Sequence, residues 1–211
     1  IGDADKRIKE DYLRILRYFR FFLSYSKIPH NKETLRKLKI NFEGVSRLSK
    51  DRLFDELKKI IKLEILEKLS KDKLSFDLIK TIFPELKYIN IFSKLKKDTK
   101  ILLKEKNFIF LLCLLIIDDT DNSDYFLYKF NISKKDRKRI KIIDNFFKEK
   151  ITKNSFTEQN MNKIFYYEGK QAVEDILYFR FFKSKKTDKS LLESNKLFKN
   201  REVPILPIKA D

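Results

Sequence analysis

The sequence predicts an all-α protein, a multi-helix array of short antiparallel helices. Apolar residues recur at helical spacing along the chain, and no stretch alternates in the way a half-buried strand does. Only three glycines and four prolines interrupt this pattern. The linkers between the periodic segments are short, which favours antiparallel packing of neighbouring helices.

The first helix is expected to begin at Asp3 or Asp5 and to end at Ile28-Pro29. An aspartate is a favoured cap at a helix start, and a residue that precedes proline avoids the α region. A short helix over residues 32–38 should follow. The apolar stripe of the first helix consists of Ile8, Tyr12, Ile15, Phe19, Phe22 and Leu23.

A second long helix is expected from Ser49 to about Leu69. Ser49 suits the N-cap position, although Arg52 stands where a capping box would have glutamate. Its apolar face consists of Leu53, Leu57, Ile60, Ile61, Ile65 and Leu66. Further helical patterns cover residues 74–82, 85–97, 98–105, 107–117, 123–130, 134–150, 159–167, 169–184 and 188–199.

The chain carries 49 lysines and arginines against 31 aspartates and glutamates, a net charge of +18 at pH 7. A charge of this size favours a polyanionic partner, because each contacted phosphate releases condensed counterions. The lysine-rich composition of an AT-rich genome accounts for part of the charge as well. The charge alone therefore does not select a function.

Cys113 is the only cysteine, which excludes an internal disulfide and favours a reducing compartment. The apolar run Phe108 to Ile117 is shorter than the roughly 20 residues that cross a bilayer, so we expect a buried helix with Cys113 in the core. No secretory signal opens the chain, because charged residues start at Asp3. We expect a cytoplasmic protein without a membrane partner.

Four aspartates lie between Asp118 and Asp124, in a segment rich in helix breakers and caps. Their spacing does not match a calcium-binding EF-hand loop, which has a central glycine and a late glutamate. We interpret the segment as a loop at a seam between helical parts and predict no metal site in this chain. His30, directly after a proline, is expected on the surface.

Asp11 and Arg14 are three residues apart, so on a helix they would lie side by side. A carboxylate beside a guanidinium matches what cytosine and adenine share, an exocyclic amine that donates next to a ring nitrogen that accepts. Uracil and guanine have a carbonyl in place of that amine, and it would face the carboxylate unfavourably. The alternative is a surface salt bridge worth about 0.2–0.5 kcal/mol.

The segment Gly2–Phe21 resembles the junction of class II CCA-adding enzymes and bacterial poly(A) polymerases, roughly I-G-D-x-x-x-R-F-x-E-D-x-L-R-x-x-R-x-x-R-F. Ile8 replaces the usual phenylalanine. The positions that match in register are Gly2, Asp3, Arg7, Glu10, Asp11, Leu13, Arg14, Arg17, Arg20 and Phe21.

Two further segments are similar to the same family. The first resembles its neck motif S-x-E-R-h-x-x-E-h, where h is apolar, through Ser49, Arg52, Glu56 and Leu57, while Asp51 replaces the expected glutamate. The second, Pro204–Asp211, is similar to the segment that precedes the tail in many bacterial members. Between about 70 and 200 the chain matches the family only in helical character.

The resemblance implies a neck-like domain with a base-selecting helix over residues 1–70. It also implies a helical body with the start of the tail over residues 71–211, a candidate tRNA-binding region. Asp11 and Arg14 would hydrogen-bond the base of incoming CTP or ATP, and Glu10 would hold Arg14 in place. Arg7, Arg17 and Arg20 would support this face or approach the triphosphate and RNA. A buried Arg52, paired with a carboxylate, and Glu56 would brace the base-selecting helix.

The activity that the resemblance implies is template-independent addition of CCA to tRNA 3′ ends, with Mg²⁺ ions held by closely spaced carboxylates. The family carries these carboxylates in an N-terminal catalytic head with a G-G-x-V-R-D pattern and a D-x-D pattern, and this combination does not occur here. We therefore expect a fragment that is inactive without a head in the same protein. A poly(A) polymerase, an enzyme that adds part of CCA, and a stand-alone RNA-binding module are the alternatives.

The basic segment from Lys134 to Lys141 is the candidate tRNA contact, because cations on successive helical turns can follow an RNA backbone. A solvated charged face explains the segment equally well. Its cations are Lys134, Lys135, Arg137, Lys138, Arg139 and Lys141. Lys183, Lys185 and Lys186 form a weaker second patch.

Overall fold

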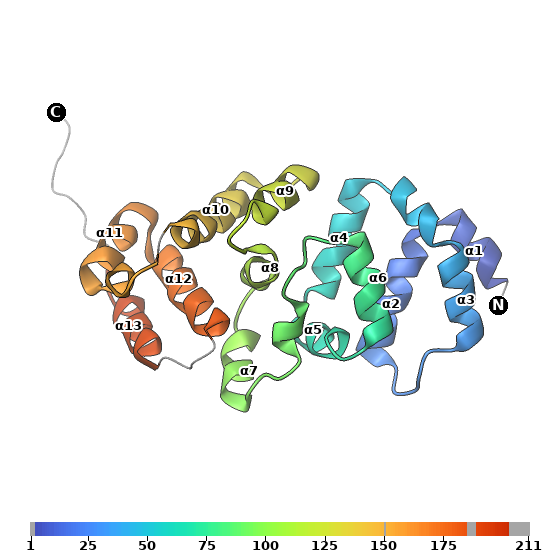
Figure 1. Ribbon diagram of the computed structural model, residues 1–211, viewed down its shortest axis with the longest axis horizontal. Coiled ribbons are helices and arrows are strands. Elements are labelled where there is room, and N and C mark those ends of the chain that lie inside the picture. The colour runs from blue at the N-terminus through green and yellow to red at the C-terminus, as the bar shows by residue number, and fades with distance from the viewer. Residues whose placement is uncertain (1–2, 150, 185–188, 203–211) are drawn as a thin grey trace. The chain divides into compact units, whose positions relative to one another are not determined.

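The computed structural model describes residues 3–149, 151–184 and 189–202, and within them the chain forms only helices and loops (Figure 1). The all-α prediction is confirmed. The chain divides into two compact units. Unit 1 holds the residues up to Ile116 and Asp124–Ile132, and unit 2 holds Ile117–Ser123 and the residues from Ser133 onward. The predicted seam at Asp118–Asp124 thus lies where the chain passes between the units.

Two helices replace the long first helix that the sequence predicted, α1 (Ala4–Glu10) and α2 (Leu13–Tyr25). The predicted cap is present, because the side chain of Asp3 accepts a hydrogen bond from the amide of Asp5 at 3.0 Å. The apolar stripe continues across the interruption. Its buried members in α1 and α2 are Ile8, Leu13, Ile15, Leu16, Phe19 and Leu23.

The second long helix is also divided, into α4 (Lys50–Ile60) and α5 (Leu63–Leu69). Ser49 caps α4 as predicted, with its side chain accepting from the amide of Arg52. The backbone leaves the helical region at Ile61 and Lys62, and this change of direction lets both Ile61 and Leu63 enter the core. Before α4 lie α3 (Lys32–Ile40) and the 3-10 turn η1 (Phe42–Arg47).

The rest of unit 1 follows the predicted elements with one exception. Of the helix predicted over residues 85–97, residues 85–96 contain only the 3-10 turn η2 (Ile89–Phe92), and Lys97 begins the next helix. The buried residues Leu86, Ile89 and Phe92 are spaced by three, which a 3-10 turn places on one face. The other elements are α6 (Lys73–Ile82), α7 (Lys97–Lys104), α8 (Phe108–Ile116) and α9 (Asn122–Lys129). Cys113 is buried in α8, as predicted.

Phenylalanine rings join distant parts of unit 1. The ring of Phe54 on α4 stacks on Phe130 at 5.5 Å between centroids, and it meets Phe126 of α9 edge-on at 6.2 Å. Figure 1 shows α2, α4 and α6 running close together in this unit. Packing of α2 against α4 and α5 brings the N-terminal segment onto the same core.

His30 is not on the surface, in contrast to the prediction, since only 9% of its side chain is exposed. Its ring stacks on Phe22 at 3.4 Å between centroids. Nδ1 lies 3.0 Å from the hydroxyl of Tyr18, and Nε2 lies 3.2 Å from the carboxylate of Asp72. Asp72 is 42 residues further along the chain, so local sequence around the proline gave no sign of this contact.

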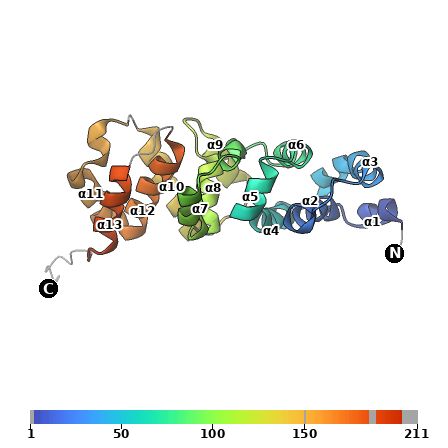
Figure 2. The same ribbon diagram turned by 90° about the horizontal axis from the view of Figure 1, so that it is seen from below.

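Unit 2 consists of α10 (Lys134–Lys148), η3 (Lys153–Phe156), α11 (Glu158–Glu168), α12 (Lys170–Lys183) and α13 (Lys189–Lys199). All four α-helices were predicted within two residues. Gly169 separates α11 from α12 with φ of 84°, a conformation that favours glycine. Figure 2 shows α11, α12 and α13 gathered beside one another.

Lys183 ends α12 with its side chain turned inward. Its Nζ donates to the carbonyl of Ile117 at 3.1 Å. Burial lowers the pKa of Lys183 to about 7, although the carboxylates of Asp118 and Asp119 act in the opposite direction. Lys183 is therefore not a surface cation, and this part of the predicted second basic patch is wrong. Lys185 and Lys186 lie outside the described residues, as do Gly2 and the segment Pro204–Asp211.

Replacement of Lys183 by methionine is expected to weaken the pH dependence of stability. In the unfolded chain the lysine pKa returns to 10.5, so between pH 7 and 10.5 the unfolded state binds more protons and the free energy of unfolding rises with pH. Between pH 7 and 9 the free energy of unfolding, measured with urea, should rise by about 2 kcal/mol more for the unmodified chain than for Lys183→Met. Lys170→Met, which removes an exposed lysine of the same helix, should show the full rise of the free energy of unfolding with pH. Equal slopes for the unmodified chain and Lys183→Met would contradict the buried ammonium.

Candidate nucleotide-binding site

The chain breaks its helical course at Asp11, where φ is −152° and ψ is 99°. One carboxylate oxygen, Oδ1, accepts the amide of Leu13 at 3.1 Å, so the side chain satisfies a free donor at the start of α2. Negative charge is favourable at this end of a helix. Asp11 and Arg14 therefore do not lie on one continuous helix, and that part of the prediction is wrong.

Tyr12, the residue after Asp11, also determines where the helical course is interrupted. Its ring lies against the α-carbon of Gly44 in η1, and a β-carbon there would come within 2.1 Å of Cδ1 and Cε1 of the ring. Only glycine leaves this room, because a rigid aromatic ring cannot yield as a flexible chain end can. The position of the break is thus set jointly by a local capping bond and by a contact with a distant turn.

Asp11 is held mainly by Arg52 of α4, whose Nη2 donates to Oδ1 at 2.8 Å. Burial alone would raise the pKa of Asp11, but the Leu13 amide, Arg52 and Arg17 outweigh it and hold the pKa below its usual value. The carboxylate is therefore ionised at neutral pH. Oδ2 lies 3.8 Å from Nη1 of Arg17 and accepts no hydrogen bond from any described residue.

Arg14 has a separate set of partners. Its Nη1 donates to a carboxylate oxygen of Glu10 at 3.1 Å and to the carbonyl of Arg7 at 2.7 Å. The contact between Glu10 and Arg14 that we expected is present. Nε and Nη2 donate to none of the described residues. Side-chain exposure is 21% for Asp11 and 32% for Arg14, so the unused oxygen and donors belong to side chains that reach solvent.

Arg52 and Glu56 on α4 hold the N-terminal segment through ion pairs. We expected Arg52 to be buried, but Glu56 is the buried residue of the two. The Arg52 side chain is 49% exposed, whereas that of Glu56 is fully buried. Glu56 accepts from Nε of Arg20 and from Nζ of Lys59, the latter at 3.2 Å, and Nε of Arg17 lies 4.0 Å away. Arg17 thus stands between Asp11 and Glu56.

The site therefore presents one free carboxylate oxygen and two free guanidinium donors, on side chains whose positions are fixed by other residues. A planar heterocycle with a donor next to an acceptor complements such a pair of groups. Sequence reasoning expected Arg52 to pair with a carboxylate but did not identify Asp11 as its partner, and it missed the contact of Gly44 with Tyr12. Both join residues more than 30 positions apart, and no local pattern in a single sequence reveals them.

Most cations of the candidate RNA contact lie on the surface of α10. Lys134, Lys135, Arg137 and Lys138 are exposed, and Lys141 is half-buried. Arg139 is different, because its Nε and Nη2 donate to the buried carboxylate of Asp175 at 2.6 and 2.8 Å. A guanidinium in that bidentate contact joins α10 to α12 and is not available to RNA.

The described residues contain neither a metal-binding cluster nor a membrane-spanning helix. Within them, no three His, Cys, Asp or Glu side chains are grouped so that they could hold a metal ion. None of the described helices combines the length and the apolar character needed to cross a membrane.

Fold and site together define an all-helical, basic protein with a partly exposed carboxylate–guanidinium cluster where two helices meet. Part of this chain is homologous to a tRNA nucleotidyltransferase. Over 63 residues it is 48% identical to the human and mouse proteins and 46% identical to the zebrafish (Danio rerio) protein called CCA tRNA nucleotidyltransferase 1, mitochondrial. The match covers 29% of this chain but only 14–15% of those proteins. No protein-family model matches the chain.

Proposed function

We propose that this chain is the nucleotide- and RNA-binding part of a template-independent tRNA nucleotidyltransferase, which adds CCA to tRNA 3′ ends from CTP and ATP. The observation that supports this most directly is that an ionised Asp11 and the nearby residue Arg14 in the sequence each keep polar groups that hydrogen-bond to no described residue. The partial homology to CCA tRNA nucleotidyltransferases supports the same proposal.

In this proposal the protein itself replaces the template base. Oδ2 of Asp11 accepts the exocyclic amine of cytosine or adenine, and Nε or Nη2 of Arg14 donates to the adjacent ring nitrogen. Glu10 and the carbonyl of Arg7 hold Arg14, and Arg52 and Arg17 hold Asp11. UTP and GTP are disfavoured, because their carbonyl oxygen faces the carboxylate.

The remaining assignments follow from the same proposal. Residues 1–70 act as the neck that selects the base, and residues 71–211 act as a body that holds tRNA. Cations of α10, four of them exposed and one half-buried, approach the phosphates of an A-form stem, which can be recognised by shape without base-specific contacts. These cations are Lys134, Lys135, Arg137, Lys138 and Lys141.

The nucleotidyl transfer itself requires Mg²⁺ on carboxylates that a catalytic head in the same protein provides. The isolated 211-residue chain is therefore expected to be inactive. A cytoplasmic location remains a prediction, and the names of the three relatives describe those proteins as mitochondrial.

Product sequencing tests this proposal. The full-length parent should extend a tRNA that lacks its 3′ end by C, C and A, with a mixture of all four nucleotides present. A product with A residues alone would assign a poly(A) polymerase, and a product of only C residues or only the final A would assign a partial-CCA enzyme. No extension, together with an upstream coding sequence that lacks a head, would replace the proposal with a stand-alone RNA-binding module.

A further inference from the structure

Two neighbouring aromatic side chains of α2 are exposed, Phe21 by 48% and Tyr25 by 75%. Their rings are stacked on each other, with 6.1 Å between the centroids and 26° between the planes. An aromatic ring contributes a large free energy when it is buried, and adjoining exposed apolar side chains commonly mark an interaction site. This ring pair, Phe21 with Tyr25, is therefore a candidate contact surface.

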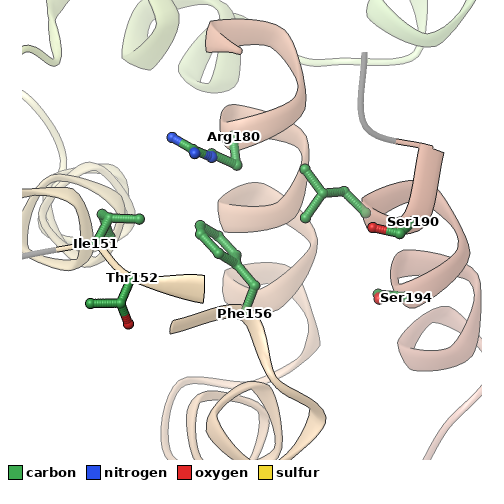
Figure 3. A pocket seen from close by; sticks show the side chains of 7 residues that line it. Ile151, Thr152, Phe156, Arg180, Ser190 and Ser194 are labelled. Carbon is green, nitrogen blue, oxygen red and sulfur yellow. The ribbon is translucent and has the colours of Figure 1, made fainter. Parts of the chain in front are cut away.

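A phenylalanine of unit 2 shows the contrasting case. The ring of Phe156 also lies beside an arginine, Arg180, with 5.6 Å between the guanidinium carbon and the ring centroid, at a cavity of about 460 Å³ (Figure 3). However, Phe156 packs on Phe146 and Phe147 at 5.5 and 6.3 Å between centroids, and it is half-buried. Phe156 thus belongs to the packing of its unit, whereas the ring pair of α2 points outward.

Cations lie around the ring pair. The guanidinium carbon of Arg20 is 4.1 Å from the centroid of the Phe21 ring. Arg17, four residues before Phe21 on the same helix, is 42% exposed. Lys68 of α5 is exposed and donates to the carbonyl of Ser24, so its ammonium lies beside the last turn of α2. Positive groups among exposed rings suit a ligand with negative charge and flat apolar surfaces.

The ring pair lies on the same face of α2 as Arg14, which with Asp11 forms the proposed base reader. Arg14, Phe21 and Tyr25 follow one another by seven and four residues, and both spacings return to one face of a helix. At a rise of about 1.5 Å per residue, Phe21 is about 10 Å along the helix from Arg14. Stacked nucleotides advance by about 3.4 Å each, so about three of them cover this distance.

We propose that the ring pair binds the single-stranded 3′ end of the RNA substrate, with bases stacked on Phe21 and Tyr25 and phosphates beside Arg17 and Lys68. Aromatic rings that take the bases and cations that follow the backbone are the usual means of binding a single strand. The identity of the RNA rests on the proposed function, whereas the binding of a single strand rests on the rings and cations alone. The proposed base reader then selects the nucleotide that is added to this strand.

Tryptophan fluorescence tests this proposal, because the 211-residue chain contains no tryptophan. Tyr25→Trp places one reporter in the ring pair, and a short single-stranded RNA of mixed sequence should quench its emission by stacking. The same RNA annealed to its complement should quench it far less. Tyr167→Trp is the matched control, since Tyr167 is also 75% exposed, and its emission should stay unchanged. Equal quenching of the two reporters, or quenching of neither, would contradict the proposal.

The affinity for the single-stranded RNA provides a second test. Phe21→Leu with Tyr25→Leu keeps apolar side chains but deletes both rings, so the affinity should fall at least about fivefold, the lower limit for one lost base–aromatic stack. Phe21→Tyr retains a ring and should bind as the unmodified chain does. Urea unfolding of the double variant should match the unmodified chain, because both rings are exposed. Unchanged affinity in the double variant would overturn the proposal.

Two further measurements separate this surface from the proposed function and from a protein partner. Asp11→Ala with Arg14→Ala should keep the RNA affinity that depends on the rings, so a failure of base selection would not remove this signal. In the full-length parent, RNA should again quench the reporter of Tyr25→Trp. If acrylamide and RNA both fail to quench that reporter in the parent, another part of the protein covers the rings and the RNA proposal is wrong.

Discussion

Replacing Asp11 and Arg14 together by alanine is expected to remove the preference of the full-length parent for CTP and ATP over UTP and GTP. The change deletes the free acceptor oxygen and the free donors that contact the base in the proposed complex. A bidentate contact to a base edge contributes about 1–3 kcal/mol of discrimination, so selectivity should fall roughly 5- to 150-fold. The measurement is kcat/KM for each nucleotide on a tRNA that ends before the final A.

A matched control distinguishes this effect from a general loss of surface charge. Asp55 and Lys58 are also three residues apart, exposed and ion-paired at 3.0 Å, on α4. Asp55→Ala with Lys58→Ala should leave nucleotide preference unchanged. Unchanged preference in the Asp11 and Arg14 variant would remove the base-selection assignment.

Asp11 also caps α2, and the variant Asp11→Asn separates that role from base selection. Asparagine keeps an oxygen that accepts the amide of Leu13, but it places a donating NH₂ group where the free carboxylate oxygen was. Preference for CTP and ATP over UTP and GTP should therefore fall, because the amide NH₂ no longer accepts the exocyclic amine of cytosine or adenine. A uniform loss of activity with all four nucleotides would indicate a purely structural role.

Glu56→Ala is expected to lower the free energy of unfolding. Its effect should exceed that of removing any other single charge from the described ion pairs of α2 and α4. Glu56 is fully buried, and its removal leaves Arg20, Arg17 and Lys59 together without a carboxylate between them. Breaking a buried pair by removing one partner costs about 3–5 kcal/mol. Urea unfolding followed by circular dichroism measures this loss.

Glu33→Ala provides the control for this experiment. Glu33 pairs with Lys37 at 3.1 Å on the surface of α3, and its side chain is 74% exposed. Such a pair contributes about 0–1 kcal/mol. A difference between the two variants of less than about 1 kcal/mol would mean that Glu56 does not act as a buried anchor.

Helices that begin at a capping side chain and carry an apolar stripe could be predicted from the sequence. Ser49 and Asp3 are caps of this kind, and both act as predicted. The interruptions at Asp11 and Ile61 could not be predicted in this way, because the apolar period continues through both. What stops the helix at Asp11 is a side chain that bonds the backbone and a tyrosine ring that fits only against Gly44.

Several residues of the candidate site could be predicted from the sequence, but most of the contacts between them could not. The contact of Glu10 with Arg14 spans four residues and follows from local spacing. The contacts of Arg52 with Asp11, and of Arg20 with Glu56, span 41 and 36 residues. Arg139 shows another limit of sequence reasoning. A run of basic residues gives no sign that one of its cations turns inward and pairs with Asp175.

The route of the chain limits how this protein can be dissected. The backbone passes between the two units three times, at Ile116, at Ser123 and at Ile132, so no single cut separates the two units from each other. A fragment that ends at residue 70 would keep Arg52 but lose the rings of Phe126 and Phe130, which cover Phe54 on the same helix. Arg52, which holds Asp11, therefore lies on a helix that packs against α9 and Phe130 from the second half of the sequence. Assays of nucleotide selection accordingly require the chain at least as far as Ile132.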